Sequence, residues 1–447
     1  MTRTVSFATL GCRLNQVDTQ ELQALLEARG FRTVPFEEPA DVVVVNSCTV
    51  TSRADVSSRQ MLRRGARRNP GARVVVTGCW AQTDPAAAAA TGADLVVGNA
   101  EKRFLPELVE RLLARGASPG RDGTAPVHVG DIARARAMDP PPPPARVDGR
   151  SRAFLKIQEG CQHRCAFCIV PLARGPSRSR GPEVLLDQVR VLVEAGHAEV
   201  VLTGVDLGHY GADLAPRTTL AALLRRMVEI PRLRWIRLSS ILPAYVTEEL
   251  FELLAGSPVM APHLHLPLQS GSDRVLRRMR RPYTVAMYRR LAERLAGAIP
   301  SLGLGADVIA GFPGETDADL AGTVALVEAL PLSYLHVFAY SDRRGTEAAR
   351  LGDRVDARTI ARRSRWLREV GREKNRAFRA ALVGSTREVL VLETRDGASG
   401  GLVGLTGNYV EVVFRGPGSL VQGMTRVRVT AADAARTLGQ LERGGVA

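Results

Sequence analysis

The sequence has few cysteines and no long apolar run. Six cysteines in 447 residues are too few for a disulfide-stapled secreted scaffold. No apolar stretch approaches the roughly 20 residues that a membrane-spanning helix needs, and residues 1–7 lack the apolar core of a secretory signal. With 45% apolar residues, the chain can still build packed cores. We therefore expect a cytoplasmic globular protein of about two to four domains.

Acidic residues are also scarce relative to basic ones. The chain has 61 Lys and Arg against 46 Asp and Glu, a formal net charge of +15. Lysine occurs only at Lys102, Lys156 and Lys374, so almost every basic residue is arginine. Genomic base composition can explain arginine in place of lysine, but it does not explain the excess of positive charge. That excess predicts a polyanionic partner such as nucleic acid.

Three of the cysteines are crowded into a short segment. Cys161, Cys165 and Cys168 follow Glu159 and Gly160 with the spacing C-x3-C-x2-C. Thiolates this close favour a metal, and zinc usually requires a fourth protein ligand, which is not evident nearby. A four-iron cluster held by three cysteines would keep one iron open for a cofactor, which makes these cysteines candidate catalytic residues. A zinc knuckle and unrelated buried thiols are the alternatives.

The other three cysteines follow strand-like runs near the N-terminus. Apolar, β-branched runs alternate there with helix-like stretches such as Gln20–Ala28 and Ala54–Arg68, which predicts an open, mostly parallel sheet flanked by helices. Because strand carboxyl ends line the ligand crevice of such sheets, cysteines there can form a second three-thiol site. Taken singly, each is more often a small buried hydrophobe. The runs are Val5–Leu10, Asp41–Val45, Arg73–Thr77 and Asp94–Gly98, and the first three are followed by Cys12, Cys48 and Cys79.

A proline run marks a boundary after the predicted sheet. Residues 140–144 are all proline, which excludes a helix or central strand and favours an extended spacer. Six strand-like runs then recur between helix-like stretches, predicting a partial (β/α) barrel with its chemistry at the strand carboxyl ends. The runs are Ala153–Gln158, Val200–Thr203, Trp235–Ser239, His263–Leu268, Gly303–Ala310 and Tyr334–Tyr340, and the polar candidates beyond them are Asp206, Ser239, Ser240 and Gln269.

The C-terminal part changes to short strands and glycine turns from about Gly384. This pattern predicts a small five-stranded β-barrel, preceded by a basic helix over Thr359–Arg379 that is either a solvated face or a contact for an anion. Aromatic and basic side chains of the small barrel can stack on or pair with nucleic acid. Equally, the aromatics can form the core of a stabilising cap. The residues concerned are Tyr409, Phe414, Arg415 and Arg426, and the predicted strands are Arg387–Glu393, Leu402–Leu405, Asn408–Phe414 and Thr425–Thr430.

Nearly the whole chain resembles the radical S-adenosylmethionine (SAM) methylthiotransferases. The resemblance implies an α/β multidomain fold: an N-terminal open parallel α/β sheet in a methylthiotransferase domain (1–138), a Pro-rich linker (139–146), a partial (β/α)6 radical-SAM barrel (147–380) and a small all-β TRAM barrel (381–447). The motifs that carry it lie at residues 9–16, 46–51, 77–79, 155–161, 174–180, 265–271 and 311–316.

The resemblance also implies two [4Fe–4S] clusters and SAM as cofactors. Cys161, Cys165 and Cys168 would hold the cluster that cleaves SAM, and Phe167 matches the aromatic residue that usually precedes the third cysteine. The auxiliary cluster that carries the inserted sulfur would be held by Cys12, Cys48 and Cys79, and further cofactor contacts are expected from Asp206, Ser239, Ser240 and Gln269.

The stretches 15–19 and 49–55 are most similar to the branch that adds a methylthio group to C2 of N6-threonylcarbamoyladenosine at position 37 of tRNA. The partners implied are the tRNA anticodon loop, an electron donor and a sulfur source of unknown identity, and no membrane. The alternatives are a methylthiotransferase for isopentenyladenosine in tRNA or for a ribosomal-protein aspartate. From a different class, the alternative is a non-catalytic RNA-binding protein stabilised by metal.

Overall fold

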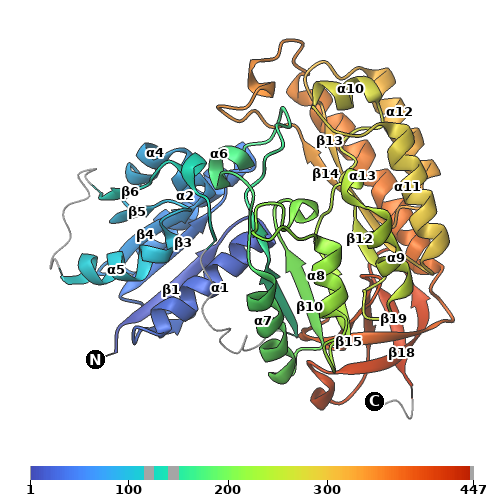
Figure 1. Ribbon diagram of the computed structural model, residues 1–447, viewed down its shortest axis with the longest axis horizontal. Coiled ribbons are helices and arrows are strands. Elements are labelled where there is room, and N and C mark those ends of the chain that lie inside the picture. The colour runs from blue at the N-terminus through green and yellow to red at the C-terminus, as the bar shows by residue number, and fades with distance from the viewer. Residues whose placement is uncertain (1, 115–124, 139–150, 443–447) are drawn as a thin grey trace. The chain divides into compact units, whose positions relative to one another are not determined.

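The computed structural model describes residues 2–114, 125–138 and 151–442 (Figure 1). The chain forms two compact units. The first comprises Met1–Ala145, Gln158–Arg180 and Ser341–Arg350, and the second comprises Arg146–Ile157, Gly181–Tyr340 and Leu351–Ala447. The predicted Pro-rich linker, 139–146, lies outside the described residues, and the domain boundaries drawn on either side of it stay predictions.

The first unit is built on a six-stranded parallel sheet in the order β2-β1-β3-β4-β5-β6. Every residue of β3 and β4 is buried, as expected for central parallel strands covered on both faces. The predicted strands are therefore present, while the short edge strands β2 and β6 were not predicted. The strands are β1 (Thr4–Thr9), β2 (Arg32–Val34), β3 (Val42–Ser47), β4 (Arg73–Gly78), β5 (Leu95–Val97) and β6 (Val127–His128).

Helices cover both faces of this sheet. Leu22 of α1 and Val109 of α5 pack on one face, while Leu62 of α2 and Trp80 of α3 pack on the other. The two faces bury separate apolar cores, which confirms the open α/β architecture. The elements are α1 (Arg13–Glu27), α2 (Ser52–Arg68), α3 (Cys79–Thr83), α4 (Pro85–Ala89), α5 (Leu105–Ala114), η1 (Lys102–Phe104) and η2 (Ile132–Arg134); the other two segments of the unit add β8 (Gln158–Glu159), α6 (Val170–Arg174), β9 (Arg178–Ser179) and η5 (Ala348–Arg350).

Six parallel strands form the core of the second unit. Two three-stranded sheets, β11-β10-β7 and β12-β13-β14, are joined by single bridges between Ile236 and Met260 and between Ser240 and His265. This is the predicted partial (β/α) barrel. The strands are β7 (Arg152–Lys156), β10 (Glu199–Thr203), β11 (Trp235–Leu238), β12 (His263–His265), β13 (Gly303–Ala310) and β14 (Tyr334–Ala339).

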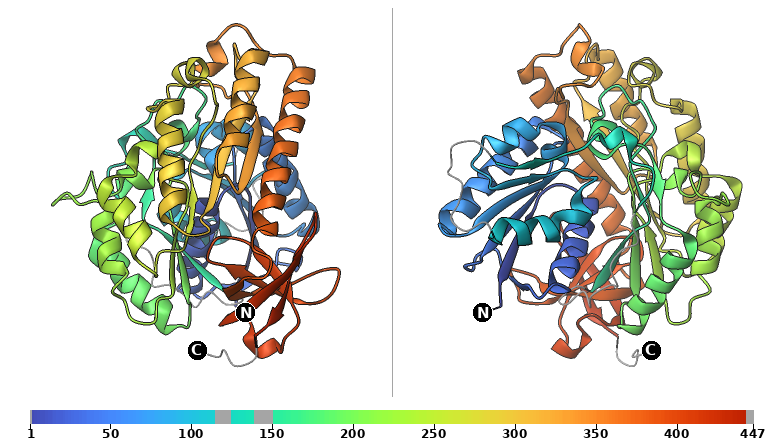
Figure 2. Two further views of the ribbon diagram at one scale, coloured as in Figure 1. Left: turned by 90° about the vertical axis from the view of Figure 1, so that its right-hand side faces the viewer. Right: turned by 60° about the vertical axis from the view of Figure 1, so that its left-hand side comes forward.

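The helices of the second unit pack on the outer side of these strands (Figure 2). One continuous apolar core joins strands and helices, with Leu264, Leu304 and Val308 among its strand residues. Side chains alternate along a strand, so the neighbours of these residues face the opposite, inner side. The elements are α7 (Pro182–Glu194), α8 (Leu220–Met227), α9 (Glu248–Gly256), α10 (Asp273–Arg278), α11 (Val285–Ala298), α12 (Asp317–Ala329), α13 (Ala357–Ala380), η3 (Leu207–His209) and η4 (Pro243–Tyr245).

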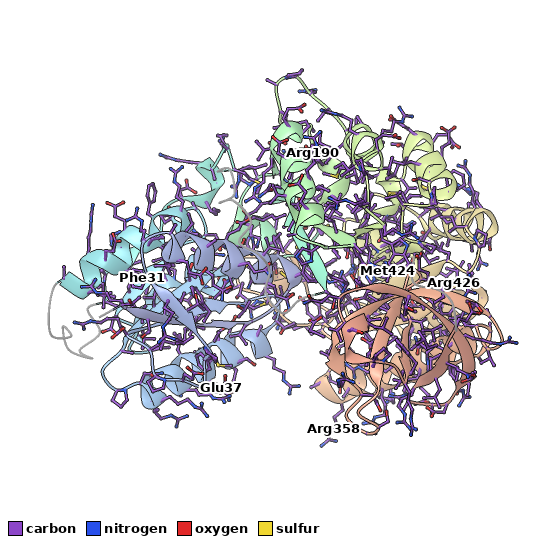
Figure 3. All side chains as sticks on the ribbon, turned by 90° about the horizontal axis from the view of Figure 1, so that it is seen from below. Phe31, Glu37, Arg190, Arg358, Met424 and Arg426 are labelled. Atoms are coloured by element: carbon purple, nitrogen blue, oxygen red, sulfur yellow. The ribbon has the colours of Figure 1, made fainter. Side chains whose placement is uncertain are left out.

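The C-terminal part of the second unit is a closed five-stranded barrel, as predicted, in the order β15-β16-β17-β19-β18. Phe414 is buried among Val389, Val412 and Val427 in its core, so the suggestion that Phe414 stacks on nucleic acid is wrong. Arg426 on β18 is largely exposed (Figure 3). The elements are β15 (Thr386–Arg395), β16 (Leu402–Thr406), β17 (Glu411–Phe414), η6 (Gly418–Leu420), β18 (Met424–Ala432) and β19 (Thr437–Leu441).

Among the described helices, none combines the length and the apolar character needed to cross a membrane.

Candidate cluster and cofactor sites

Cys12, Cys48 and Cys79 follow three neighbouring strands of the first unit, and we call them the sheet triad. Cys12 directly precedes α1, Cys48 follows the last residue of β3, and Cys79 begins α3 directly after β4. Strands β1, β3 and β4 are adjacent and parallel, so the three cysteines lie at the same edge of the sheet. The convergence predicted from the sequence is therefore present in the fold.

Electrostatics shows how close these thiols are to one another. Burial, with smaller contributions from the neighbouring Cys79 and Cys12, raises the pKa of Cys48 to about 11. None of the six cysteines, all in the described part of the chain, forms a disulfide. A buried thiol next to two others has a costly thiolate until a cation compensates the charge, and a bound metal supplies that compensation. The sheet triad fits a metal cluster in this respect.

Glycines directly precede three of the six cysteines, and their geometry explains why. Gly11, Gly78 and Gly160 all have positive φ, at 98°, 96° and 74°, where other residues are strained. A Cβ on Gly11 would lie 2.7 Å from Cys48 Sγ, and one on Gly160 would lie 2.0 Å from the Pro176 carbonyl oxygen. The backbone therefore turns tightly just before each of these three cysteines, and at Gly11 it makes room for the sulfur of Cys48.

Cys161, Cys165 and Cys168 lie on a single loop of the first unit, and we call them the loop triad. The segment is a non-helical loop in which the Cys168 N–H donates to the Cys165 carbonyl at 3.0 Å. The His163 N–H donates to Cys161 Sγ at 3.4 Å, a bond that stabilises a thiolate. All three cysteines are partly exposed. Partial exposure suits a cluster that must admit a cofactor to its open iron.

A buried arginine, Arg174, joins the loop triad's segment to α1. Its guanidinium donates to Glu159, to Asn15 Oδ1 at 2.5 Å and to Asp18 Oδ2 at 2.9 Å, and Asp18 also accepts from Lys102 Nζ at 2.6 Å. Burial alone would lower the pKa of Arg174, but the sheet-triad cysteines Cys79 and Cys12 and the two carboxylates raise it. Arg174 is therefore a fixed positive charge beside the sheet triad.

Asn99 makes a second link of the same kind. Its Nδ2 donates to the Ala173 carbonyl at 2.7 Å and lies 3.8 Å from Cys79 Sγ. Sequence reasoning missed both Asn99 and Arg174 as parts of the site. Arg174 stands at the start of the motif quoted at 174–180, which is the one signal that could have singled it out; Asn99 carried none.

The predicted cofactor contacts are divided between the units. Phe167 is half-buried in the loop triad's segment, in the first unit. The other four lie beyond β10, β11 and β12 of the second unit, as expected for a barrel rim. Asp206 is buried at the start of η3, Ser239 and Ser240 follow β11, and Gln269 adopts a positive φ of 69°.

Ser239 and Gln269 have features that suit ligand binding. Ser239 Oγ is buried without a hydrogen-bond partner among the described residues, a condition that native structures usually relieve with water or a ligand. The strained backbone of Gln269 is held by its N–H donating to the Asp307 carbonyl at 2.7 Å and by its carbonyl accepting from the Ile309 N–H at 3.0 Å. Such strain is concentrated at functional sites.

Comparison with known proteins identifies the family. The Radical SAM superfamily matches residues 155–327, and Uncharacterized protein family UPF0004 matches residues 4–98. A Bacillus subtilis protein named threonylcarbamoyladenosine tRNA methylthiotransferase MtaB is 38% identical over 98% of this chain and 96% of its own length. The chain belongs to the radical-SAM methylthiotransferases. A relative of the same name from Aquifex aeolicus is 39% identical over 92% of this chain and 97% of its own length.

Other methylthiotransferases are also similar. A Parafrankia protein named tRNA-2-methylthio-N(6)-dimethylallyladenosine synthase is 35% identical, covering 93% of this chain and 84% of its own length. Among solved structures, the radical SAM methyltransferase TsrM from Kitasatospora setae aligns with a TM-score of 0.55 at 19% identity, over 76% of this chain and 75% of its own. At that identity the likeness concerns the fold alone.

Family membership brings two [4Fe–4S] clusters and SAM as the expected cofactors. The donors present fit them, because the six cysteines fall into two groups of three and a three-thiolate site leaves one iron open. A zinc site closed by four protein ligands is the poorer match.

Proposed function

We propose that this methylthiotransferase adds a methylthio group to C2 of N6-threonylcarbamoyladenosine at position 37 of tRNA. The observation that carries the proposal is the 38% identity to the B. subtilis enzyme of that name, which extends over 98% of this chain. The relatives named for dimethylallyladenosine are less similar, at 35% to 37% identity over 88% to 93% of the chain. The acidic N6 substituent is therefore the better-supported target.

In this proposal the loop triad holds the cluster that binds SAM and the sheet triad holds the auxiliary cluster. When bound, these groups supply the electron and the SAM-derived radical that removes the hydrogen from C2, together with the sulfur that replaces it. The chain's own residues position the groups. The His163 N–H fixes Cys161 Sγ, and Arg174 provides the positive charge that offsets the sheet-triad thiolates. Asp206, Ser239, Ser240, Gln269 and Phe167 are proposed to contact SAM or the substrate.

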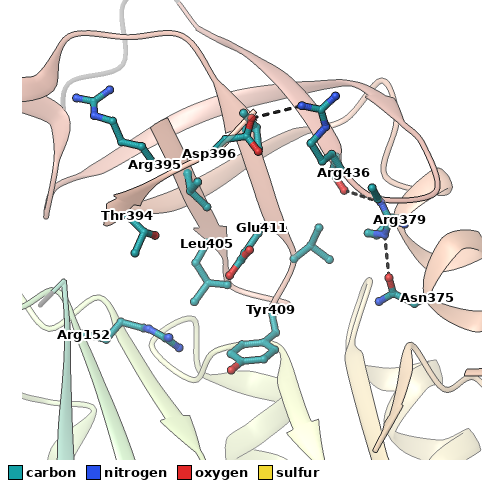
Figure 4. A pocket seen from close by; sticks show the side chains of 16 residues that line it. Arg152, Asn375, Arg379, Thr394, Arg395, Asp396, Leu405, Tyr409, Glu411 and Arg436 are labelled. Atoms are coloured by element: carbon teal, nitrogen blue, oxygen red, sulfur yellow. Dashed lines mark hydrogen bonds and ion pairs between the residues drawn. The ribbon is translucent and has the colours of Figure 1, made fainter. Parts of the chain in front are cut away.

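A basic cavity in the second unit supports contact with tRNA. It has a volume of about 530 Å³ and is lined by Arg152, Arg395, Arg436, Tyr409 and Glu411 among others (Figure 4). Arg395 is exposed, while Arg436 is paired with Asp396 at 3.3 Å. Exposed arginines bind phosphate oxygens well, and such binding weakens steeply with salt.

The remaining parts of the proposal concern organisation. We place the methylthiotransferase domain at 1–138, the radical-SAM domain at 147–380 and the TRAM domain at 381–447, and the protein in the cytoplasm where tRNA is modified. The electron donor and the sulfur source are separate partners of unknown identity.

Nucleoside analysis tests the function. Transfer RNA from a strain lacking this protein should contain N6-threonylcarbamoyladenosine without its methylthio derivative, and the wild-type gene should restore the derivative. Persistence of the methylthio derivative in the deletion strain would refute the assignment. Loss of methylthiolated isopentenyladenosine instead would reassign the enzyme to the other tRNA branch.

A further inference from the structure

The inner face of three neighbouring strands in the second unit carries a cluster of histidines around one carboxylate. Leu264, Leu304 and Val308 pack into the apolar core beneath the helices, so residues one position along each strand face away from that core. On β12 these are His263 and His265, on β13 Asp307, and on β14 Tyr334 and His336. A sheet face lined with imidazoles suits a polar ligand better than apolar packing.

Hydrogen bonds join these side chains into one network. Tyr334 Oη lies 2.9 Å from His263 Nε2 and 3.1 Å from His265 Nδ1. Asp307 Oδ1 lies 2.9 Å from His265 Nε2 and 3.3 Å from His336 Nδ1. One carboxylate therefore accepts a hydrogen bond from two imidazoles. Because a carboxylate only accepts, Asp307 requires a proton on Nε2 of His265 and on Nδ1 of His336.

The hydrogen-bonded network ends at His336, whose side chain is accessible to solvent. Asp307 occupies Nδ1 of His336, and 57% of the His336 side chain is exposed, against 20% for Asp307 and 7% for His265. Nε2 of the ring is therefore left for an incoming group. Burial alone would raise the pKa of Asp307, but the bonds from His265 and His336 hold it below its usual range. Asp307 is thus an anion that orients His336, and the ring can donate from Nε2 to a carboxylate when both of its nitrogens carry protons.

The cluster adjoins the candidate cofactor contacts of the same unit. Ser240 is paired with His265 in a β-bridge, and the Gln269 N–H donates to the Asp307 carbonyl at 2.7 Å. Two of the four rim candidates are therefore bonded directly to the strands that carry the histidines. A substrate group that contacts the rim has a short path to His336.

We propose that His336, oriented by Asp307, binds the carboxylate of the threonyl group on the N6 substituent and so selects an acidic substrate. The inference rests on the proposed function, because that substituent carries a carboxylate whereas the isopentenyl group is apolar. A charge-assisted hydrogen bond from an oriented imidazole to a carboxylate discriminates by about ten- to hundredfold against a partner that lacks the charge. His265 and Tyr334 are positioning residues, which act on the substrate through Asp307 and His336.

The test compares two anticodon stem-loop RNAs that differ only at the carboxylate. One carries N6-threonylcarbamoyladenosine and the other carries its threonine methyl ester, and kcat/KM for methylthiolation is measured with the reconstituted holoenzyme. We expect the wild-type enzyme to prefer the acid about ten- to hundredfold, and His336→Phe to bring the acid-to-ester ratio close to one. His336→Gln, which keeps an N–H donor, should recover part of the ratio. His128→Phe replaces an exposed histidine on β6 and serves as the matched control, with the wild-type ratio.

Each outcome decides the proposal. An equal wild-type rate on acid and ester would overturn it while leaving the methylthiotransferase assignment intact, as would an unchanged ratio in His336→Phe. If kcat/KM for the acid and for the ester falls by the same factor in His336→Phe, His336 has a structural role and the proposal is overturned too. The potential metal-ligating atoms of His265, Asp307 and His336 lie within 4.8 Å of one another, so the metal content of the holoenzyme is also measured. A stoichiometric divalent ion other than cluster iron that is lost in His336→Phe would show that these residues bind a metal ion rather than the substrate carboxylate, and would overturn the proposal. A wild-type holoenzyme that cleaves SAM but modifies neither RNA would overturn the proposed function itself.

Discussion

Replacing Arg174 with methionine should loosen the loop that carries Cys161, Cys165 and Cys168. The side chain of Arg174 is only 2% exposed and bonds to Glu159 and Asp18. Methionine fills a similar volume but removes the charge, so the two carboxylates lose their shared partner inside the protein. Removing one member of a buried ion pair costs about 3 to 5 kcal/mol because the remaining charge is left uncompensated.

The structure places the expected cost at the lower end of that range. Asp18 keeps its bond to Lys102 Nζ at 2.6 Å, and Glu159 has Arg178 Nη2 at 3.8 Å. Both carboxylates therefore keep a basic neighbour, more distant for Glu159 than for Asp18, and we expect a loss of about 3 kcal/mol in local stability. That loss corresponds to a roughly hundredfold increase in the population of the opened segment.

Hydrogen exchange of backbone amides in the anaerobic holoenzyme measures this opening directly. The Cys161 N–H donates to the Gly175 carbonyl at 3.0 Å and is the reporter. Its exchange should accelerate roughly a hundredfold in Arg174→Met, and less in Glu159→Gln/Arg174→Met, where the charge on residue 159 is removed as well. Arg111→Met removes an exposed ion pair with Glu107 and should change little. Exchange within about threefold of wild type in Arg174→Met, or a double variant no slower than the single one, would refute the reasoning.

Three further predictions follow from the site and its surroundings. Alanine at all three loop-triad cysteines should abolish SAM cleavage, whereas alanine at all three sheet-triad cysteines should spare cleavage and stop methylthiolation. Assays of 5′-deoxyadenosine and of methylthiolated product measure the two activities separately. Equal loss of SAM cleavage in the two variants would contradict this division. Because burial raises the pKa of Cys48 to about 11, its thiolate fraction at pH 8 is roughly a hundredfold below that of an ordinary thiol. Iodoacetamide should therefore modify Cys48 far more slowly than the exposed Cys12 in iron-free protein. Comparable modification rates of the two thiols, measured by mass spectrometry, would contradict the raised pKa. Arg237→Met should leave the fully buried carboxylate of Glu199 without its ion-pair partner and speed amide exchange in β11 by at least a hundredfold (about 3 kcal/mol or more). Exchange should recover in part in Glu199→Gln/Arg237→Met. An unchanged exchange rate in β11 of Arg237→Met would argue against the cost of an uncompensated buried charge.

Local pattern and one spatial rule were enough to predict the fold. Valine runs that are buried on both faces, as in β3 and β4, are visible in sequence, and parallel strands bring their carboxyl ends together. Edge strands such as β2 and β6, with three and two residues, are too short to leave a periodic signal. The strand predicted to end at Leu268 ends at His265, although the Leu266 and Leu268 N–H groups still donate to the Gly305 and Asp307 carbonyls of β13 before the backbone turns at Gln269.

The candidate site was predictable only where one residue type revealed it. Cysteines are rare enough for their spacing to be informative, and their assignment to two clusters remains a prediction that the geometry suits. The cluster around Asp307 gave no such signal, because His265, Asp307 and His336 occupy single positions in separate strands and are brought together by register alone. Arg174 was hidden for a similar reason, since its partners Asn15 and Asp18 lie in a distant helix.

The most direct test of the central claim follows one hydrogen atom. The reconstituted holoenzyme is given SAM, a reductant and an anticodon stem-loop whose N6-threonylcarbamoyladenosine carries deuterium at C2. We expect methylthiolated product together with 5′-deoxyadenosine that has gained the deuterium. Product formed without deuterium in 5′-deoxyadenosine, or SAM cleavage with no product from an enzyme loaded with both clusters, would contradict it.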